Sequence, residues 1–283
     1  MDRIALLRPL IGFWSVWFAA CNSSSPPPSS TSAGPDQRTG GASDEELFVE
    51  RALTRDGRTW RYRVFVPRVA PRDGARRPAI LFLHGMGERG DDNRKQLDVG
   101  LGPYIRHHAG EFPAIAVLPQ APDDGRWSGA SADAALAALD AASAEFDADP
   151  DRAYLTGVSR GGYGTWILAL MQPRRFAALV PICGGLTGLP ERPGQLVEPA
   201  ANEQDPFPAV AGALRHIPSW IFHGARDDVI PPDQSRRMAA ALRAAGGEVR
   251  YTEFPDAAHD SWDAAYAAPG LWDWVFAQRR QSR

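Results

Sequence analysis

Short apolar runs, separated by polar segments that contain Gly and Pro, recur along the chain from about residue 47 onward. Five of these runs have the length and composition of strands that are buried on both faces: 79–83, 115–118, 153–155, 177–182 and 220–222. Two earlier segments, 47–53 and 59–66, contain alternating β-formers such as Trp60 and Tyr62, which predicts an opening strand pair. A further strand-like run, 249–254, lies near the C-terminal end.

Helical patterns lie between these strands. They cover residues 132–146, 162–171, 234–245 and 271–278. In the first, Leu136, Leu139 and Phe146 are spaced for one buried face, and the third ends at a Gly-Gly pair, a natural helix stop. Strands that alternate with helices indicate βαβ units. Without repeats or a second break in composition, we expect one α/β domain over 47–283, with a mostly parallel sheet covered by helices on both faces.

The first 46 residues have a different pattern. Residues 1–20 carry Arg3 and Arg8 and then an apolar run, which is typical of a secretory signal and too short to span a bilayer comfortably. The segment Phe18-Ala19-Ala20-Cys21 resembles the lipobox of bacterial lipoproteins, in which the cysteine is lipidated after cleavage. That family prefers Leu where this chain has Phe18, so ordinary cleavage after Ala20 is the alternative.

Residues 21–46 are rich in Ser, Pro and Gly and nearly lack apolar side chains. Such a segment buries too little surface to offset its ordering entropy, so we expect a disordered tether. The order of signal, tether and folded domain predicts an exported protein, anchored in a membrane through lipid on Cys21 and facing the periplasm or exterior. A soluble secreted protein is the alternative.

Composition excludes several functional classes. The net charge is −3, from 31 basic and 34 acidic side chains, and the arginines are scattered, so no nucleic-acid partner is expected. The two cysteines, Cys21 and Cys183, provide neither a disulfide framework nor a metal site. Cys183 lies in an apolar run and is interpreted as a small core residue. No metal or cofactor is expected.

One candidate nucleophile is Ser159, in Gly157-Val158-Ser159-Arg160-Gly161. The motif G-x-S-x-G alone is weak evidence, because chance supplies it in roughly one chain of this length in ten. Here it follows a predicted strand and precedes a predicted helix, which is the turn that exposes a nucleophilic serine. We therefore interpret Ser159 as a nucleophile on a strand-to-helix turn.

A serine nucleophile needs a base and an acid that orients it. Among six histidines, His259 lies in the loop after the last strand-like run, where the order Ser, acid, His places the base. His84 and His223 sit beside glycines at strand ends and are interpreted as structural. The acid should follow the strand 220–222, where Asp227 and Asp228 are adjacent. Only one of them can point toward the histidine, and Asp227 is favoured.

Acyl transfer also requires donors for the developing oxyanion. The two candidates are the backbone N–H groups of Met86, in a glycine loop after the strand 79–83, and of Arg160, at a helix N-terminus. A phosphate-binding role for that glycine loop is disfavoured, since no Walker lysine follows it. Trp127, Trp166 and Trp262 are candidates for an aromatic substrate cleft, although aromatic residues at helical spacing more often belong to a core.

Four motifs in the expected order then reveal a resemblance, carried by 83–90, 154–166 with 176–185, 220–227 and 259–262. They resemble the predicted-peptidase and esterase branch of the α/β hydrolases, with dienelactone-hydrolase-like, polyhydroxybutyrate-depolymerase-like and feruloyl-type relatives. The resemblance implies an α/β-hydrolase fold and a triad of Ser159, Asp227 and His259. Many relatives have Met where this chain has Arg160, which implies a positive side chain beside the acyl site, suited to acidic or sugar-linked substrates.

The sequence therefore predicts a serine carboxylic-ester hydrolase that acts on a small-molecule or polymer-derived ester through an acyl-enzyme. A serine peptidase of the same fold shares every triad feature and is the first alternative. A catalytically silent, tethered binding protein is the second. The identity of the ester does not follow from the sequence.

Overall fold

The protein is described from a computed structural model over residues 43–68, 74–188, 196–197 and 204–280. The predicted signal 1–20, Cys21 and most of the predicted tether lie outside these ranges. The last tether residues, however, form the short helix α1 (Asp44–Leu47), which begins with a Ser43–Glu46 capping box. Arg106 Nε donates to Asp44 Oδ1 at 2.7 Å and fastens this helix to the domain. The prediction of disorder up to residue 46 is therefore wrong for 43–46, because polar capping and an ion pair replace the missing apolar contacts.

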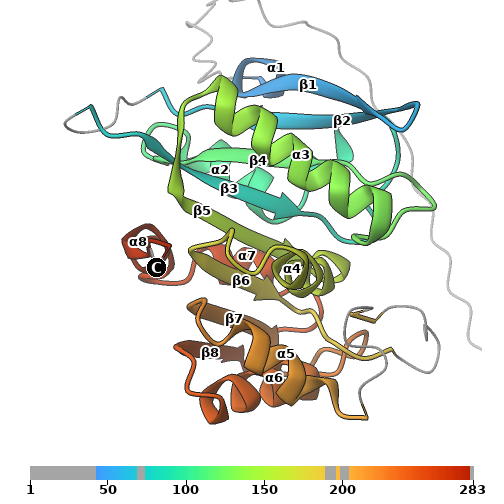
Figure 1. Ribbon diagram of the computed structural model, residues 1–283, viewed down its shortest axis with the longest axis vertical. Coiled ribbons are helices and arrows are strands. Elements are labelled where there is room, and N and C mark those ends of the chain that lie inside the picture. The colour runs from blue at the N-terminus through green and yellow to red at the C-terminus, as the bar shows by residue number, and fades with distance from the viewer. Residues whose placement is uncertain (1–42, 69–73, 189–195, 198–203, 281–283) are drawn as a thin grey trace, which may run out of the picture. The chain divides into compact units, whose positions relative to one another are not determined.

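An eight-stranded sheet forms the centre of the domain, in the order β1-β2-β4-β3-β5-β6-β7-β8 (Figure 1). The first two strands are antiparallel to their neighbours and the other six run parallel to one another. The strands are β1 (Phe48–Arg55), β2 (Arg58–Phe65), β3 (Arg77–Leu83), β4 (Ile115–Pro119), β5 (Ala148–Val158), β6 (Ala178–Ile182), β7 (Ser219–Gly224) and β8 (Val249–Phe254).

Helices cover both faces of this sheet. One buried cluster joins the sheet to α3 (Gly129–Glu145), α4 (Arg160–Met171), α5 (Pro206–Leu214) and α6 (Asp233–Ala244). A second cluster, on the other face, joins it to α2 (Leu101–His108), α7 (Trp262–Tyr266) and α8 (Leu271–Ala277) (Figure 1). A short 3₁₀ helix, η2 (Lys95–Leu97), precedes α2. In the described part of the chain, no helix has both the length and the apolar character needed to cross a membrane.

The predicted α/β architecture is confirmed, including the opening antiparallel pair and the mostly parallel sheet. The central strands β4 and β6 are fully buried, which explains their unbroken apolar runs. Helices α5 and α7 were not predicted. The first begins at Asp205, whose carboxylate caps Phe207 N–H, and the second is only five residues long. Such short segments give weak periodic signals.

Candidate active site

The carboxyl ends of the parallel strands bring the candidate residues to one edge of the sheet. Ser159 follows β5, the central strand, between β3 on one side and β6 on the other. His84 and Met86 follow β3, whereas Asp227 follows β7 and His259 follows β8. This is the edge at which open α/β sheets bind ligands, beside the point where the strand order reverses.

Ser159 occupies a strained turn between β5 and α4. Its φ and ψ are 54° and −115°, values that cost a non-glycine residue about 1–3 kcal/mol. The backbone bond from Ser159 N–H to Ile182 O, at 2.9 Å, holds the turn against β6. A Cβ on Gly157 would lie 2.3 Å from Gly161 O, and one on Gly161 would lie 1.9 Å from Leu83 O. Both glycines of the motif are therefore required by close backbone approach.

A continuous chain of hydrogen bonds leads from the serine to a buried carboxylate. His259 Nε2 lies 2.8 Å from Ser159 Oγ, and His259 Nδ1 lies 2.8 Å from Asp227 Oδ2. The Trp262 ring stands edge-on to the imidazole, with centroids 5.9 Å apart. The structure thus brings the predicted nucleophile, base and acid together, although 100 residues separate the serine from the histidine.

Asp227 is buried and surrounded by donors. Its Oδ1 accepts hydrogen bonds from Val229 N–H at 2.9 Å and from Ile230 N–H at 2.8 Å. Its Oδ2 faces His259 Nδ1 and also His223 Nε2, at 3.1 Å. Burial by itself would raise the pKa of Asp227, but the hydrogen bonds from the two rings and from Ile230 N–H outweigh it and hold the pKa far below the usual range. The carboxylate is therefore ionised and acts as an acceptor only.

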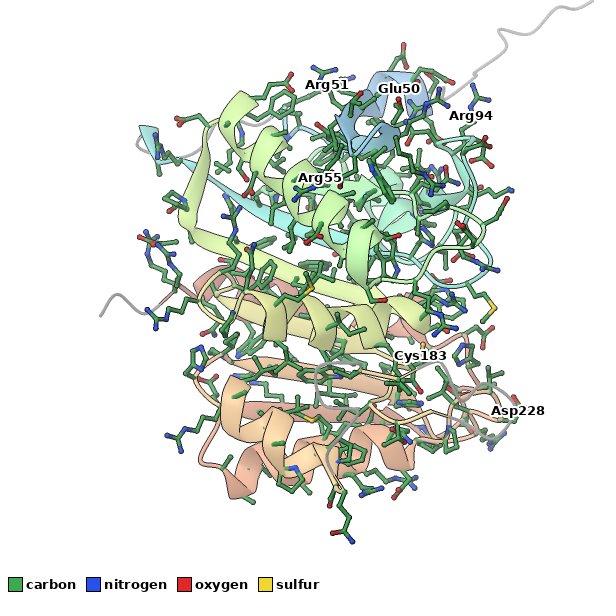
Figure 2. All side chains as sticks on the ribbon, turned by 45° about the vertical axis from the view of Figure 1, so that its right-hand side comes forward. Glu50, Arg51, Arg55, Arg94, Cys183 and Asp228 are labelled. Atoms are coloured by element: carbon green, nitrogen blue, oxygen red, sulfur yellow. The ribbon has the colours of Figure 1, made fainter. Side chains whose placement is uncertain are left out.

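The neighbouring acids do not contribute to this chain. Asp228 is exposed and points outward (Figure 2). The cysteine that was predicted to be a core residue, Cys183, is buried inside the domain (Figure 2). Asp256 and Asp260 are exposed as well, and Asp256 pairs with Arg226. Because successive side chains of the loop diverge, only Asp227 reaches the histidine, as the sequence favoured.

His84 organises the loop that follows β3. Its ring is fully buried, Nε2 accepts a hydrogen bond from Ala121 N–H at 2.9 Å, and Nδ1 donates to Gly85 O at 2.7 Å. Burial lowers the pKa of His84 to about 4, with smaller contributions from the positive charges of Arg89 and Arg160. The ring is therefore neutral at physiological pH, and its two hydrogen bonds join the loop after β3 to the loop after β4.

Further polar contacts fix the same loop beside the serine. Arg89 Nε donates to Met86 O at 2.9 Å, and its Nη1 donates to Asp123 O. A Cβ on Gly85 would lie 3.7 Å from Ser159 Cβ, so the loop backbone passes close to the candidate nucleophile. The carbonyls of Gly85 and Met86 are thus both bonded to side chains, which fixes the course of the loop backbone.

Arg160 is the first residue of α4 and directly follows Ser159. Its backbone N–H is at the positive end of the helix dipole, the position from which it was predicted to bind an oxyanion. Its side chain donates from Nη1 to Gly125 O at 3.0 Å. The guanidinium therefore bridges the helix to the loop before α3.

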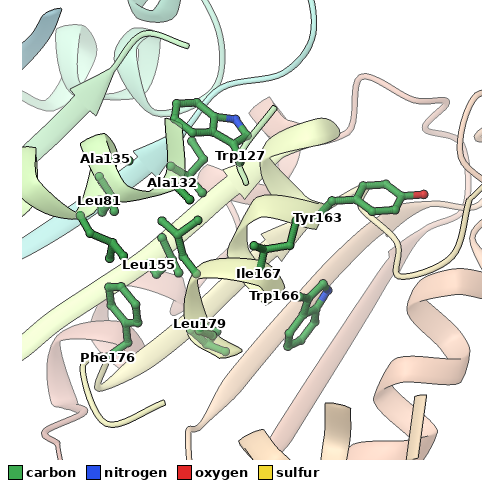
Figure 3. Packing of buried hydrophobic residues seen from close by; sticks show 14 of the residues in the cluster. Leu81, Trp127, Ala132, Ala135, Leu155, Tyr163, Trp166, Ile167, Phe176 and Leu179 are labelled. Carbon is green, nitrogen blue, oxygen red and sulfur yellow. The ribbon is translucent and has the colours of Figure 1, made fainter. Parts of the chain in front are cut away.

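Two of the three tryptophans predicted for the cleft lie elsewhere. Trp127 and Trp166 are each only 2% exposed and belong to the core between the sheet, α3 and α4 (Figure 3). Trp127 also donates from Nε1 to His84 O at 2.9 Å, so it holds the loop after β3 from the core side. Trp262 is half-buried beside His259. The cleft assignment is thus wrong for Trp127 and Trp166, because both rings complete the buried face of the sheet.

His223 was predicted to be structural, yet its Nε2 lies 3.1 Å from Oδ2 of the candidate acid Asp227. The ring is fully buried, and its Nδ1 lies 2.7 Å from Ser235 Oγ. The available signal was the spacing of His223 and Asp227, four residues apart across a turn. Within the described ranges, no group of three or more His, Cys, Asp or Glu side chains is arranged to hold a metal ion.

One family of proteins and one curated protein match parts of this chain. Residues 123–186 match the prolyl oligopeptidase family. Over 127 residues the chain is 30% identical to YuxL, an uncharacterized peptidase of Bacillus subtilis, and the match covers 40% of this chain and 19% of that protein. The chain thus spans about a fifth of the curated relative that it matches.

Solved structures extend the similarity to the whole domain. A thermostable esterase superposes with a TM-score of 0.66 and 28% identity, over 83% of this chain and 63% of that one. A ferulic acid esterase gives a TM-score of 0.63 and 17% identity, over 81% of this chain and 97% of that one. The second likeness concerns the fold alone. The sheet order, the strained serine turn and these similar structures show that the chain has the α/β-hydrolase fold.

Proposed function

We propose that this protein hydrolyses carboxylic esters through a catalytic triad of Ser159, His259 and Asp227. The observation that carries the proposal is the unbroken chain of two 2.8 Å hydrogen bonds from the serine through the imidazole to the carboxylate. An ionised, buried Asp227 keeps a proton on His259 Nδ1, so that Nε2 presents its lone pair to the serine hydroxyl.

Acylation follows from this arrangement. His259 Nε2 takes the hydroxyl proton while Ser159 Oγ attacks the ester carbonyl, and the negative charge of Asp227 stabilises the imidazolium that forms. The Met86 and Arg160 N–H groups stabilise the oxyanion. The imidazolium then gives its proton to the leaving alcohol. In deacylation His259 activates a water molecule, which attacks the acyl-enzyme, and Ser159 recovers its proton as the acid leaves.

The first test is p-nitrophenyl acetate hydrolysis by wild type and by Ser159→Ala. We expect the variant to lose at least about a thousandfold in kcat, since the residual rate would come from binding and the oxyanion donors alone. Ser219→Ala is the matched control, because Ser219 is buried on β7 and its hydroxyl donates only to Ile217 O. Equal turnover by wild type and Ser159→Ala would remove Ser159 from the mechanism.

Peptide hydrolysis is the second candidate, favoured by the match of residues 123–186 to the prolyl oligopeptidase family. An ester and an anilide with the same acyl group separate the two activities. We expect the ester to be cleaved with the higher kcat/KM by a factor well above their intrinsic reactivity difference. A preference for the peptidyl anilide would instead identify a peptidase. A separate experiment, labelling with a fluorophosphonate, tests the third candidate. If Ser159 is not labelled, the protein is a binding protein rather than a hydrolase.

We also propose that the protein is exported and anchored through lipid on Cys21. The support is the charged and apolar pattern of residues 1–20 followed by the lipobox-like segment. Mass spectrometry of the mature N-terminus tests it, with Cys21→Ser and globomycin as the perturbations. We expect both to block maturation, whereas an unmodified N-terminus after Ala20 would show ordinary secretion.

A further inference from the structure

We propose that His223, its tautomer fixed by Ser235, is a positioning residue that donates a second hydrogen bond to Oδ2 of Asp227 and thereby tunes the basicity of His259. The inference rests on the proposed hydrolytic function and deepens it. The hydrogen-bonded chain of the site then has five members rather than three: Ser235, His223, Asp227, His259 and Ser159.

The proton positions follow from the acceptor. An ionised carboxylate only accepts hydrogen bonds, so each ring nitrogen that faces Oδ2 must carry a hydrogen. One is His259 Nδ1, at 2.8 Å, and the other is His223 Nε2, at 3.1 Å. His223 Nε2 donates to Ile230 O at 3.0 Å and lies 3.1 Å from Asp227 Oδ2, so its hydrogen lies between a carbonyl oxygen and a carboxylate oxygen, both of which can only accept.

Ser235 completes the assignment. With its hydrogen on Nε2, a neutral His223 ring has a lone pair on Nδ1, and Ser235 Oγ lies 2.7 Å from that nitrogen. The serine is buried at the start of α6, and its hydroxyl can donate into the lone pair. A neutral ring leaves the negative charge of Asp227 to the imidazolium that forms at His259 during catalysis.

A hydrogen bond from His223 to Asp227 changes the charge that His259 meets, in addition to holding the carboxylate in place. Oδ2 is the atom that both rings share, so a hydrogen bond from His223 withdraws part of the negative charge that faces His259. A further charged group close to His223 is Glu253, its register neighbour on β8, which forms an ion pair with Arg236 at 2.7 Å. Tyr251 also donates to Glu253. Glu253 is thus neutralised locally, and Asp227 is the anion that His223 contacts directly.

Two measurements test the proposal: an NMR determination of the His223 tautomer, which requires no catalytic activity, and the pH dependence of kcat/KM, which does. In protein labelled with ¹⁵N-histidine, long-range proton–nitrogen spectra report the tautomer of each ring, and His223→Gln identifies the His223 signals by their loss. We expect the Nε2–H tautomer with a hydrogen-bonded Nδ1. The Nδ1–H tautomer would overturn the proposal whether or not the protein hydrolyses esters.

The kinetic part follows kcat/KM against pH for His223→Leu, His223→Gln and Ser235→Ala. Without the second donor, Asp227 favours the imidazolium more strongly, so the acidic limb moves to higher pH, by about half a unit or more in His223→Leu and by less in Ser235→Ala. Glutamine places an N–H near the position of Nε2 and restores most of the profile. We also expect kcat/KM to fall about tenfold in His223→Leu.

Ser219→Ala is the control for lost stability. It removes a buried hydroxyl from the same strand, β7, and breaks none of the hydrogen bonds that link Ser235 to Ser159. An acidic limb at the wild-type pH in both His223→Leu and Ser235→Ala would assign His223 a packing role only. If His223→Leu fails to fold, Ser235→Ala and the wild-type spectrum decide. A protein without any esterase activity would refute the proposed function, while the spectrum would still test the hydrogen-bonded chain.

Discussion

Two groups of loops meet at Ser159, and they are stabilised in different ways. The loops after β7 and β8 hold a buried charge, Asp227, with donors on both of its oxygens. The loops after β3 and β4 hold backbone in place, through the neutral ring of His84 and the guanidinium of Arg89. The first group should therefore be sensitive to changes of charge that keep shape, and the second to changes of shape that keep charge.

Asp227→Asn is the change expected to have the largest effect. The amide keeps the shape of the side chain but removes the charge, and its NH₂ group faces ring N–H groups that need an acceptor. We expect kcat to fall about a thousand- to ten-thousand-fold. Asp228→Asn is the matched control, because Asp228 is adjacent and exposed. A similar loss in both variants would show that the acid has been misassigned.

Gly161→Ala tests the opposite sensitivity, to shape at constant charge. The added methyl would lie 1.9 Å from Leu83 O and 2.9 Å from His84 O, both backbone atoms that cannot move cheaply. We expect a loss of about 3 kcal/mol or more in the free energy of unfolding, measured with urea. Gly212→Ala, on α5 with open space around it, should instead stabilise the protein slightly. Unchanged stability in Gly161→Ala would contradict the close contact between the serine turn and β3.

The neutral ring of His84 makes stability depend on pH. Its folded-state pKa of about 4 lies below the usual value near 6.5, so the unfolded chain binds a proton in this window and the folded protein does not. The unfolding free energy should thus fall as the pH drops from about 6.5 to 4, with about 3 kcal/mol attributable to this group. Urea unfolding at several pH values measures it. His84→Gln should flatten the curve in this window, and an equally steep curve would exclude His84 as the cause.

Arg89→Met should have the smallest effect of the four. It removes the donor that holds Met86 O but leaves the charges of the triad untouched. We expect kcat to fall about tenfold with KM nearly unchanged, because a displaced N–H weakens oxyanion binding more than substrate binding. Arg94→Met is the matched control, because Arg94 is an exposed arginine that forms an ion pair with Glu45. A rise in KM alone would place Arg89 in substrate binding.

The sequence predicted the fold and the three residues of the candidate triad better than it predicted the residues that pack against them. Strand periodicity and the order of serine, acid and histidine depend on local patterns and chain order, so Ser159, Asp227 and His259 could be named in advance. The role proposed for His223 was missed, since its spacing of four residues from Asp227 is a weak signal and its partner Ser235 lies twelve residues away on another element. Trp127 and Trp166 were misplaced for a related reason: nothing local distinguishes a ring facing a cleft from one facing a core.

The span of the site along the chain has a consequence for folding. The turn that carries Ser159 is complete once β5, β6 and α4 have packed. His259 lies 100 residues later in the sequence and reaches the serine only after β8 has paired with β7. Contacts at such separation form late when loop closure limits the rate. Under the proposed function, the onset of esterase activity during refolding would therefore follow closure of the last sheet edge. If the proposed function holds, the time at which hydrolytic activity appears would therefore report the final stage of folding.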